Sequence, residues 1–177
     1  MRFQKRKFKE LVLYISAKCQ EHEFFGKVKL NKLLFFSDFT AFRRRGLSIT
    51  GANYQKLKMG PSPRLMPSIL DEMIANAELA IIRKKCYDRI QHRPTPLRES
   101  NLEFFEAWEI DIVNDMIVKY KDQTADEISN RSHKFIGYEL ASLKEDIPYS
   151  TVYCREQEPS DITPEIIKIA VALERQA

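Results

Sequence analysis

The chain has 177 residues, of which 44% are hydrophobic and 31% charged, and this length and composition indicate one globular domain and exclude a disordered chain. No run approaches the roughly 18 apolar residues that span a bilayer, and no uninterrupted apolar segment follows the basic start Met1–Lys7, so we predict a cytoplasmic protein without membrane contact. Residues 1–98 hold 21 Lys or Arg and 8 Asp or Glu, while residues 99–177 hold 8 and 17; these halves either attract each other or present a cationic face to nucleic acid or an acidic protein.

Two helices are predicted first. Residues 4–21 repeat apolar side chains at steps of three and four, which is typical of an amphipathic helix. Residues 28–44 are apolar nearly all round, so we expect a central, buried helix that ends at the cations and glycine of Arg43–Gly46. Asp38 and Asn31 lie on this second helix and are either buried and paired or turned outward; for Asp38 we expect a buried ion pair.

The next segment alternates short elements with proline-rich turns. Residues 47–60 favour a short extended segment, and Gly60–Pro63 predicts a turn because each proline restricts its own backbone and that of the residue before it. A third helix is predicted over 63–77 and a hairpin over 79–93, with a boundary at Pro94–Pro96.

The remaining residues favour helices. We predict helices over 100–121, 124–131, 132–142 and 163–175, the last of them after an irregular stretch that Pro148 closes. Two of these begin with the pattern of a capping box, which pairs Ser100 with Glu103 and Thr124 with Glu127. The pattern predicts an α+β fold, mainly α, with a helical core and a small antiparallel hairpin or short sheet, and one domain over residues 1–177.

Patterns that carry enzyme chemistry are absent from the sequence. It contains no GxxxxGK[ST], GxGxxG or GxSxG motif, and only five glycines. Three cysteines without a CxxC pair argue against a disulfide framework or a zinc site, and Cys19 with His22 would supply only half of a metal site. His133 lacks a recognisable partner for nucleophilic catalysis, so we interpret it as structural. We predict no enzyme, no catalytic residue, no metal and no cofactor.

A nucleic-acid function is the alternative. The order helix, helix, strand, helix, hairpin in the first half is loosely winged-helix-like, and Arg43–Arg45 could touch phosphates. The helix that would read DNA, 63–77, contains Arg64 against Asp71 and Glu72, whereas phosphate contact needs several cations. A DNA-binding, autoregulatory protein therefore ranks second to a protein that binds another protein.

Several segments, in order along residues 5–153, resemble one family. The helix KLNKLLFFSD at 29–38 is similar to the KLxKLLYFAD-type helix of Panacea domains, the SocA-like antitoxin domains of prokaryotic and phage toxin–antitoxin loci. The segments 49–57, 60–63, 79–82, 128–133 and 147–149 also fit that pattern. The structural motif residues implied by the resemblance are Lys29, Asn31, Lys32, Asp38, Gly60, Pro61, Pro63, His133, Pro148 and Tyr149. The chain departs from the family pattern at Lys58, Met59, Ser62, Lys134, Phe135 and Tyr138.

The resemblance implies an antitoxin that neutralises a cognate toxin, encoded by a neighbouring gene, by direct protein–protein binding. The resemblance also implies a chaperone role, or an adaptor role that delivers the toxin to a cellular protease. It does not indicate an oligomeric state. Side chains around the Gly60–Pro63 turn are the candidate partner-binding residues, because aromatic residues, Met and Arg are enriched in interface cores: Tyr54, Lys56, Lys58, Met59 and Arg64. Tyr54 and Met59 could instead pack in the core.

Overall fold

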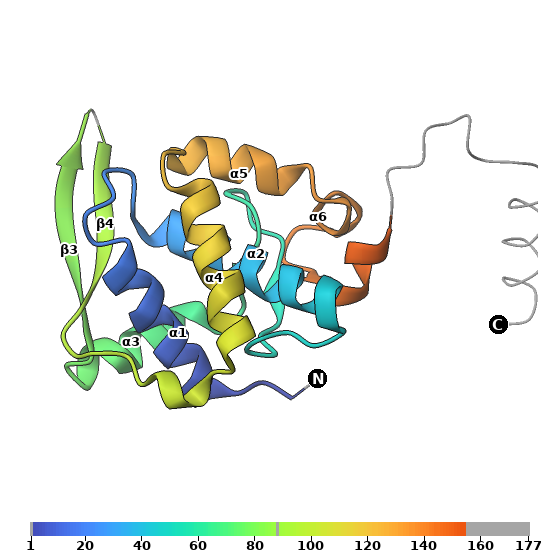
Figure 1. Ribbon diagram of the computed structural model, residues 1–177. Helices are drawn as coiled ribbons and strands as arrows, with labels where there is room; N and C mark the ends of the chain where they lie inside the picture. The colour runs from blue at the N-terminus through green and yellow to red at the C-terminus, as the bar shows by residue number, and fades with distance from the viewer. Residues whose placement is uncertain (1, 88, 155–177) are drawn as a thin grey trace, which may run out of the picture.

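The fold is mainly helical with two small antiparallel sheets, which confirms the predicted class (Figure 1). The computed structural model describes residues 2–87 and 89–154, so the predicted helix 163–175 lies outside the described residues. The elements in chain order are α1 (Lys5–Lys18), α2 (Lys27–Arg45), β1 (Tyr54–Gln55), β2 (Ser62–Pro63), α3 (Met66–Ala75), β3 (Leu79–Cys86), β4 (Arg89–Pro96), η1 (Leu102–Phe104), α4 (Ala107–Tyr120), α5 (Ala125–His133), α6 (Ile136–Leu140), β5 (Asp146–Ile147) and η2 (Tyr149–Tyr153). Within the described residues, no helix has the length and hydropathy to cross a membrane.

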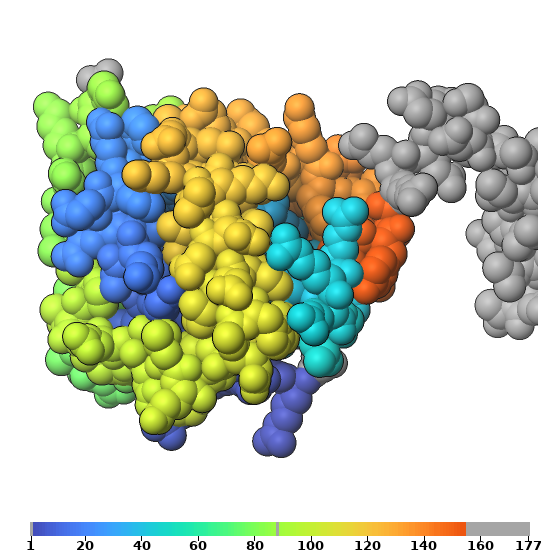
Figure 2. All heavy atoms as spheres, in the orientation of Figure 1, coloured from blue at the N-terminus to red at the C-terminus, as the bar shows by residue number. Residues whose placement is uncertain are grey.

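Helix α2 lies at the centre of the fold. It packs against α1, α4, α5, β2 and η2, which is why its sequence is apolar on nearly every side. The atoms of α4 cover much of it in Figure 2, where the end of α2 emerges beside them. The helix ends as predicted at Gly46, whose φ of 71° is left-handed and whose N–H donates to the carbonyl of Phe42.

An aromatic cluster fixes the segments that follow α2. Phe35 and Phe39 contact each other and the rings of Tyr54 and Phe135, and Phe39 also contacts Tyr149, with the centroids of these pairs 4.2–5.6 Å apart. Aromatic pairs of this kind add stability beyond the area they bury. The cluster therefore holds β1, the α5–α6 junction and η2 against one side of α2.

The strands differ from the prediction in two ways. Strand β1 lies between β2 and β5 and does not pair with the β3–β4 hairpin. The elements therefore follow one another in a winged-helix-like order, but the first strand and the hairpin do not form one sheet. The hairpin is longer than predicted, because β4 continues through Pro94 and Pro96. Prolines are tolerated there because both strands of a two-stranded sheet are edge strands, and the backbone on the unpaired edge of such a strand needs no N–H donor.

Three helix starts also differ from the prediction, and one of them is that of α6, which begins at Ile136 instead of residue 132 because α5 continues to His133. Helix α3 begins at Met66 instead of residue 63, because Ser62–Pro63 pairs with β1. Helix α4 begins at Ala107, and its capping box is Glu106 with Glu109, so the predicted box of Ser100 with Glu103 is wrong. Residues 100–106 instead form a strap with the short η1 turn. The box of Thr124 with Glu127 is confirmed at the start of α5.

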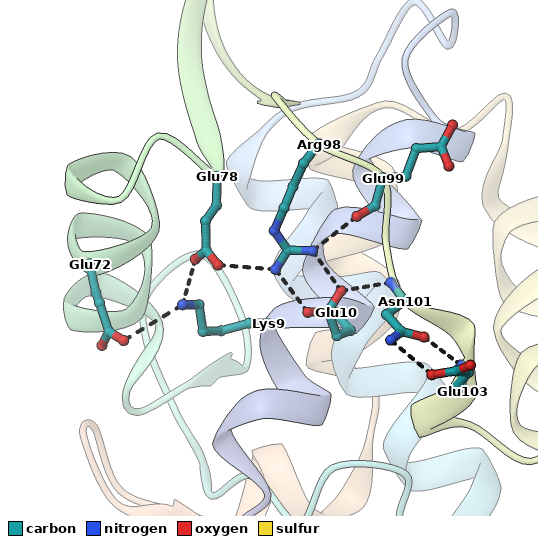
Figure 3. Close-up of polar contacts among 8 residues, drawn as sticks. All are labelled: Lys9, Glu10, Glu72, Glu78, Arg98, Glu99, Asn101 and Glu103. Atoms are coloured by element: carbon teal, nitrogen blue, oxygen red, sulfur yellow. Dashed lines mark hydrogen bonds and ion pairs between the residues drawn. The ribbon is translucent and has the colours of Figure 1, made fainter.

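An ion-pair network anchors the base of the hairpin (Figure 3). The Arg98 guanidinium donates to both oxygens of the buried Glu10 at 2.8 and 2.9 Å and to Glu78 at 3.0 Å. Lys9 pairs with Glu78, and the backbone N–H of Asn101 donates to Glu10 at 2.8 Å. These contacts connect α1, the start of β3 and the strap after β4. The two carboxylates, Glu10 and Glu78, and the two cations, Lys9 and Arg98, are all paired, so we interpret the network as structural.

Candidate partner-binding groove

The predicted motif residue Asp38 is a buried hydrogen-bond acceptor. Its carboxylate accepts from the Thr50 N–H at 2.8 Å, the Thr50 hydroxyl at 2.6 Å and the Tyr54 hydroxyl at 2.7 Å. No cation pairs with it among residues 2–87 and 89–154, so the expected ion pair is wrong, and burial raises its pKa. Hydroxyl and amide donors take the place of a cation. Asp38 thereby fixes the segment that leads into β1.

Tyr54 belongs to the core. Its side chain is 1% exposed, its ring contacts Phe35 and Phe39, and its hydroxyl donates to Asp38. Of the two interpretations of this residue, the core interpretation agrees with the structure. A partner could reach the ring only if β1 moved.

The Gly60–Pro63 turn is held between α2 and α5. Lys32 is buried and donates from Nζ to the Pro61 carbonyl at 2.9 Å, while the Ser129 hydroxyl donates to the Met59 carbonyl at 3.1 Å. Gly60 has a φ of 91°, and a Cβ there would lie 2.5 Å from the Ser132 hydroxyl oxygen. Only glycine meets both demands. Burial lowers the pKa of Lys32 to about 7. The turn is thus fixed, with Met59 at its outer edge.

Two other motif residues, Lys29 and His133, contact neighbouring elements, whereas Asn31 does not show such a contact through its side-chain oxygen. Lys29 is buried, and its Nζ donates to the carbonyls of Lys121 and Gln123 at 2.7 Å each, where the last turn of α4 leads into α5. His133 stacks on Tyr138 with centroids 4.7 Å apart, and burial, with Lys32 and Lys56 nearby, lowers its pKa. Asn31 is partly buried, and no donor from the described residues reaches its Oδ1.

Lys56 and Arg64 lie on the other side of the turn and take part in internal contacts. Arg64 donates to Asp146 at 2.6 and 2.8 Å and to the Lys144 carbonyl at 2.9 Å. Lys56 lies over the Tyr138 ring, with its Nζ 4.6 Å from the centroid. The Arg64 contacts fasten the end of β2 to β5, and the Lys56 contact joins the end of β1 to α6. A substitution at either residue would therefore disturb the local structure as well as any contact with a partner.

The β3–β4 hairpin is anchored along its length to the body of the protein. Arg93 is buried and donates to the carbonyls of Gln20, His22 and Glu23 at 2.6–3.2 Å. Nearer the tip, Arg89 donates to Asp126 at 2.6 Å, in the first turn of α5. With the Arg98 network at its base, the hairpin forms a fixed wall.

A groove of about 640 Å³ lies between this wall, the start of α2 and the start of α5. Met59, Tyr87 and Ile90 line it with exposed fractions of 50%, 74% and 62%, so large apolar side chains face solvent here. Its volume falls in the range of roughly 300–1,000 Å³ that binding pockets occupy. The remaining lining residues are Phe24, Gly26, Lys27, Val28, Lys29, Cys86, Arg89, Gln91, His92, Thr124, Ala125 and Asp126.

The groove brings together only part of the predicted site. Of the five candidate contact residues, Met59 lines it and Lys58 is exposed next to Met59. The sequence interpretation missed Tyr87 and Ile90, although two large apolar residues at a hairpin tip rich in Lys and Arg are a recognisable signal of a contact surface. Within the described residues, no group of three or more His, Cys, Asp or Glu side chains could hold a metal ion. The lining suits binding of an apolar surface.

Comparison with known proteins gives one family. The family model described as Antitoxin SocA-like, Panacea domain, matches residues 30–136, which run from α2 to the start of α6 and include the turn, the hairpin and α5. No curated protein and no solved structure matches the chain.

Proposed function

The chain belongs to the SocA-like antitoxin family of Panacea domains, and from this premise we propose that it neutralises a cognate toxin by binding it directly through the groove around Met59. We choose this surface on one observation. The large apolar side chain of Met59 is half exposed, and the turn that carries it is fixed by hydrogen bonds from Lys32 and Ser129. A surface that is already rigid loses little conformational entropy on docking.

The partner that we propose is the product of a neighbouring gene, bound in the cytoplasm. We also propose that residues 1–177 act as one domain, because α1 and η2 lie outside the matched residues yet pack against α2. A chaperone role, or transfer of the toxin to a cellular protease, would begin with this same complex. The function proposed requires no catalytic residue and no cofactor.

The helix that would enter the major groove of DNA gives no support for DNA binding. Helix α3 contains no Lys or Arg, and its carboxylate Glu72 pairs with Lys5 and Lys9. Neutralising phosphates requires cations on the contacting surface. For this reason we favour a protein partner.

The proposal is tested by affinity measurement between the purified chain and the neighbouring gene product. Met59→Asp places a charge in the groove and is expected to weaken binding by about tenfold or more, or ~1.4 kcal/mol. Leu65→Asp is the matched control, because Leu65 is also 50% exposed but lies at the start of α3, outside the groove. Equal binding by both variants would exclude the groove, and no binding by the wild-type chain would exclude this partner.

A further inference from the structure

The groove has an uncovered apolar surface whose most exposed member is held in a strained conformation. Tyr87 follows β3 at the hairpin tip, is 74% exposed and has a φ of 52°. Hairpin turns with positive φ favour Asn, Asp or Gly, so a tyrosine here is conformationally costly. The large ring contributes little to the protein's own core, which suggests a role in contact with something outside it.

Unpaired cations surround this apolar surface. Lys27 lines the groove, and Lys84 and Lys85 lie on β3 directly across from Gln91 and Ile90, which also line it. None of the three lysines has an ion-pair partner in the part of the chain that the structure describes, and Lys84 and Lys85 are exposed. Lys85 shares one face of the hairpin with Ile90, and Lys84 shares the opposite face with Gln91, so the two ammonium groups lie on either side of the strand, each beside a residue that lines the groove.

The start of α2 adds positive potential at the same place. Its N-cap is Gly26, no side chain caps its first N–H groups, and its first turn contains Lys27 and Lys29 but no acidic residue. The N-terminus of a helix of 19 residues favours an anion. The neighbouring start of α5 differs, because the Thr124 capping box and Asp126 already neutralise it. Residues Gly26–Lys29 line the groove with their backbone uncompensated.

We propose that the groove binds an acidic amphipathic helix of the partner protein. The inference rests on the proposed function and names the partner's chemistry. Apolar side chains of the helix, spaced three and four residues apart, pack on Met59, Tyr87 and Ile90, as in other helix-in-groove complexes. Carboxylates flanking that stripe face Lys84 and Lys85, and one carboxylate approaches the N-terminus of α2. The charge complementarity selects an acidic helix over a basic one.

The test uses a fluorescein-labelled peptide of about 18 residues, with Leu at positions i, i+3, i+4 and i+7 and Glu beside that stripe. Fluorescence anisotropy with the full chain is expected to give a dissociation constant on the order of 10 μM, and a matched peptide with Lys in place of Glu to bind at least about tenfold more weakly. Ile90→Asp is expected to abolish binding. Ile82→Asp is the control, because Ile82 is 51% exposed on β3 but outside the groove. Equal binding of both peptides, or none, would overturn the proposal.

A second arm uses the complex with the neighbouring gene product. A photo-cross-linking amino acid at position 87 is expected to label one acidic, amphipathic segment of the partner, while the same group at Val118, also 74% exposed but on α4, labels none. Labelling of residues 155–177 of this chain, of a second copy or of nucleic acid would overturn the proposal. If the complex forms and the double substitution of Lys84→Glu and Lys85→Glu leaves its affinity unchanged, the acidic helix is refuted and the proposed function stands. If no complex forms with the neighbouring gene product, the proposed function is refuted while the peptide result stands.

Discussion

Replacing Lys32 with methionine removes a buried ammonium group beneath the Gly60–Pro63 turn. The side chain is 1% exposed, and its Nζ donates to the Pro61 carbonyl. Burial lowers the pKa from its ordinary value of 10.5 to about 7, an interval worth about 5 kcal/mol at 1.36 kcal/mol per pH unit. Because the folded pKa is the lower one, the unfolded chain binds more protons between pH 7 and 10.5. Stability is therefore gained as the pH rises and lost as it falls towards 7.

The magnitude can be stated for a practical window. Between pH 7 and 9, Lys32 should add about 2 kcal/mol to the free energy of unfolding of the wild-type chain, and the Lys32→Met variant should lack this increment. At pH 7 the variant avoids most of the charge penalty but leaves the Pro61 carbonyl without its donor, which costs about 1–3 kcal/mol. We expect a net gain on the order of 1–3 kcal/mol, as for other buried charges replaced by apolar groups.

The assay is urea unfolding of both proteins at pH 7 and pH 9, followed by circular dichroism. The Cys19 thiol also contributes a pH dependence, because its ordinary pKa of 9.0 applies in the unfolded chain while burial raises its folded pKa to about 12. This thiol is present in both proteins, so its contribution cancels in the difference. If the stability difference between the variant and the wild type is the same at both pH values, Lys32 does not carry the buried charge that this reasoning assigns to it.

Three further changes test other parts of the fold. Gly60→Ala is expected to lower the free energy of unfolding by about 2–4 kcal/mol in chemical denaturation, through strain at positive φ and crowding against Ser132 and Lys32. Gly46→Ala, with open space around it, should lower it by only about 1 kcal/mol, and equal losses would contradict the close packing of the Gly60–Pro63 turn. Asp38→Ala leaves three buried donors without an acceptor and should cost about 3 kcal/mol or more by the same measurement, so a loss near zero would contradict the role of Asp38 as a buried acceptor. Burial alone would raise the pKa of Glu10, but bonds from Arg98 and a backbone N–H outweigh it and hold the pKa below 4.5, so this stability is present above pH 4.5 and lost as the pH falls further. Arg98→Met should therefore move the midpoint of acid unfolding upward by about half a pH unit or more, and an unchanged midpoint would refute the network's contribution.

Local patterns predicted the helices well, because their signals lie within one turn of the chain. The apolar sequence of α2, its end at Gly46 and the Thr124 capping box depend on residues three or four apart. The start of α4 was wrong because Ser100 and Glu103 fit a capping pattern that Glu106 and Glu109 satisfy instead. Spacing alone does not distinguish two such candidates.

The candidate site was harder to predict, because it is assembled from distant segments. Nothing near Asp38 in the sequence reveals that hydroxyls from Thr50 and Tyr54 would replace a cation. The groove requires the turn at Met59, the hairpin tip at Tyr87 and the start of α5, which meet only through tertiary contacts such as Arg89 with Asp126. The resemblance to a family located the turn, whereas the hairpin wall emerged from the fold.

The central claim, that this chain neutralises a toxin through the groove, is tested most directly by growth of cells that express the neighbouring gene product. Expressed alone, that product is expected to arrest growth. Co-expression of the wild-type chain or Leu65→Asp should restore growth, and Met59→Asp should fail to do so although it accumulates to the same level. A harmless neighbouring product, or full rescue by Met59→Asp, would contradict the account.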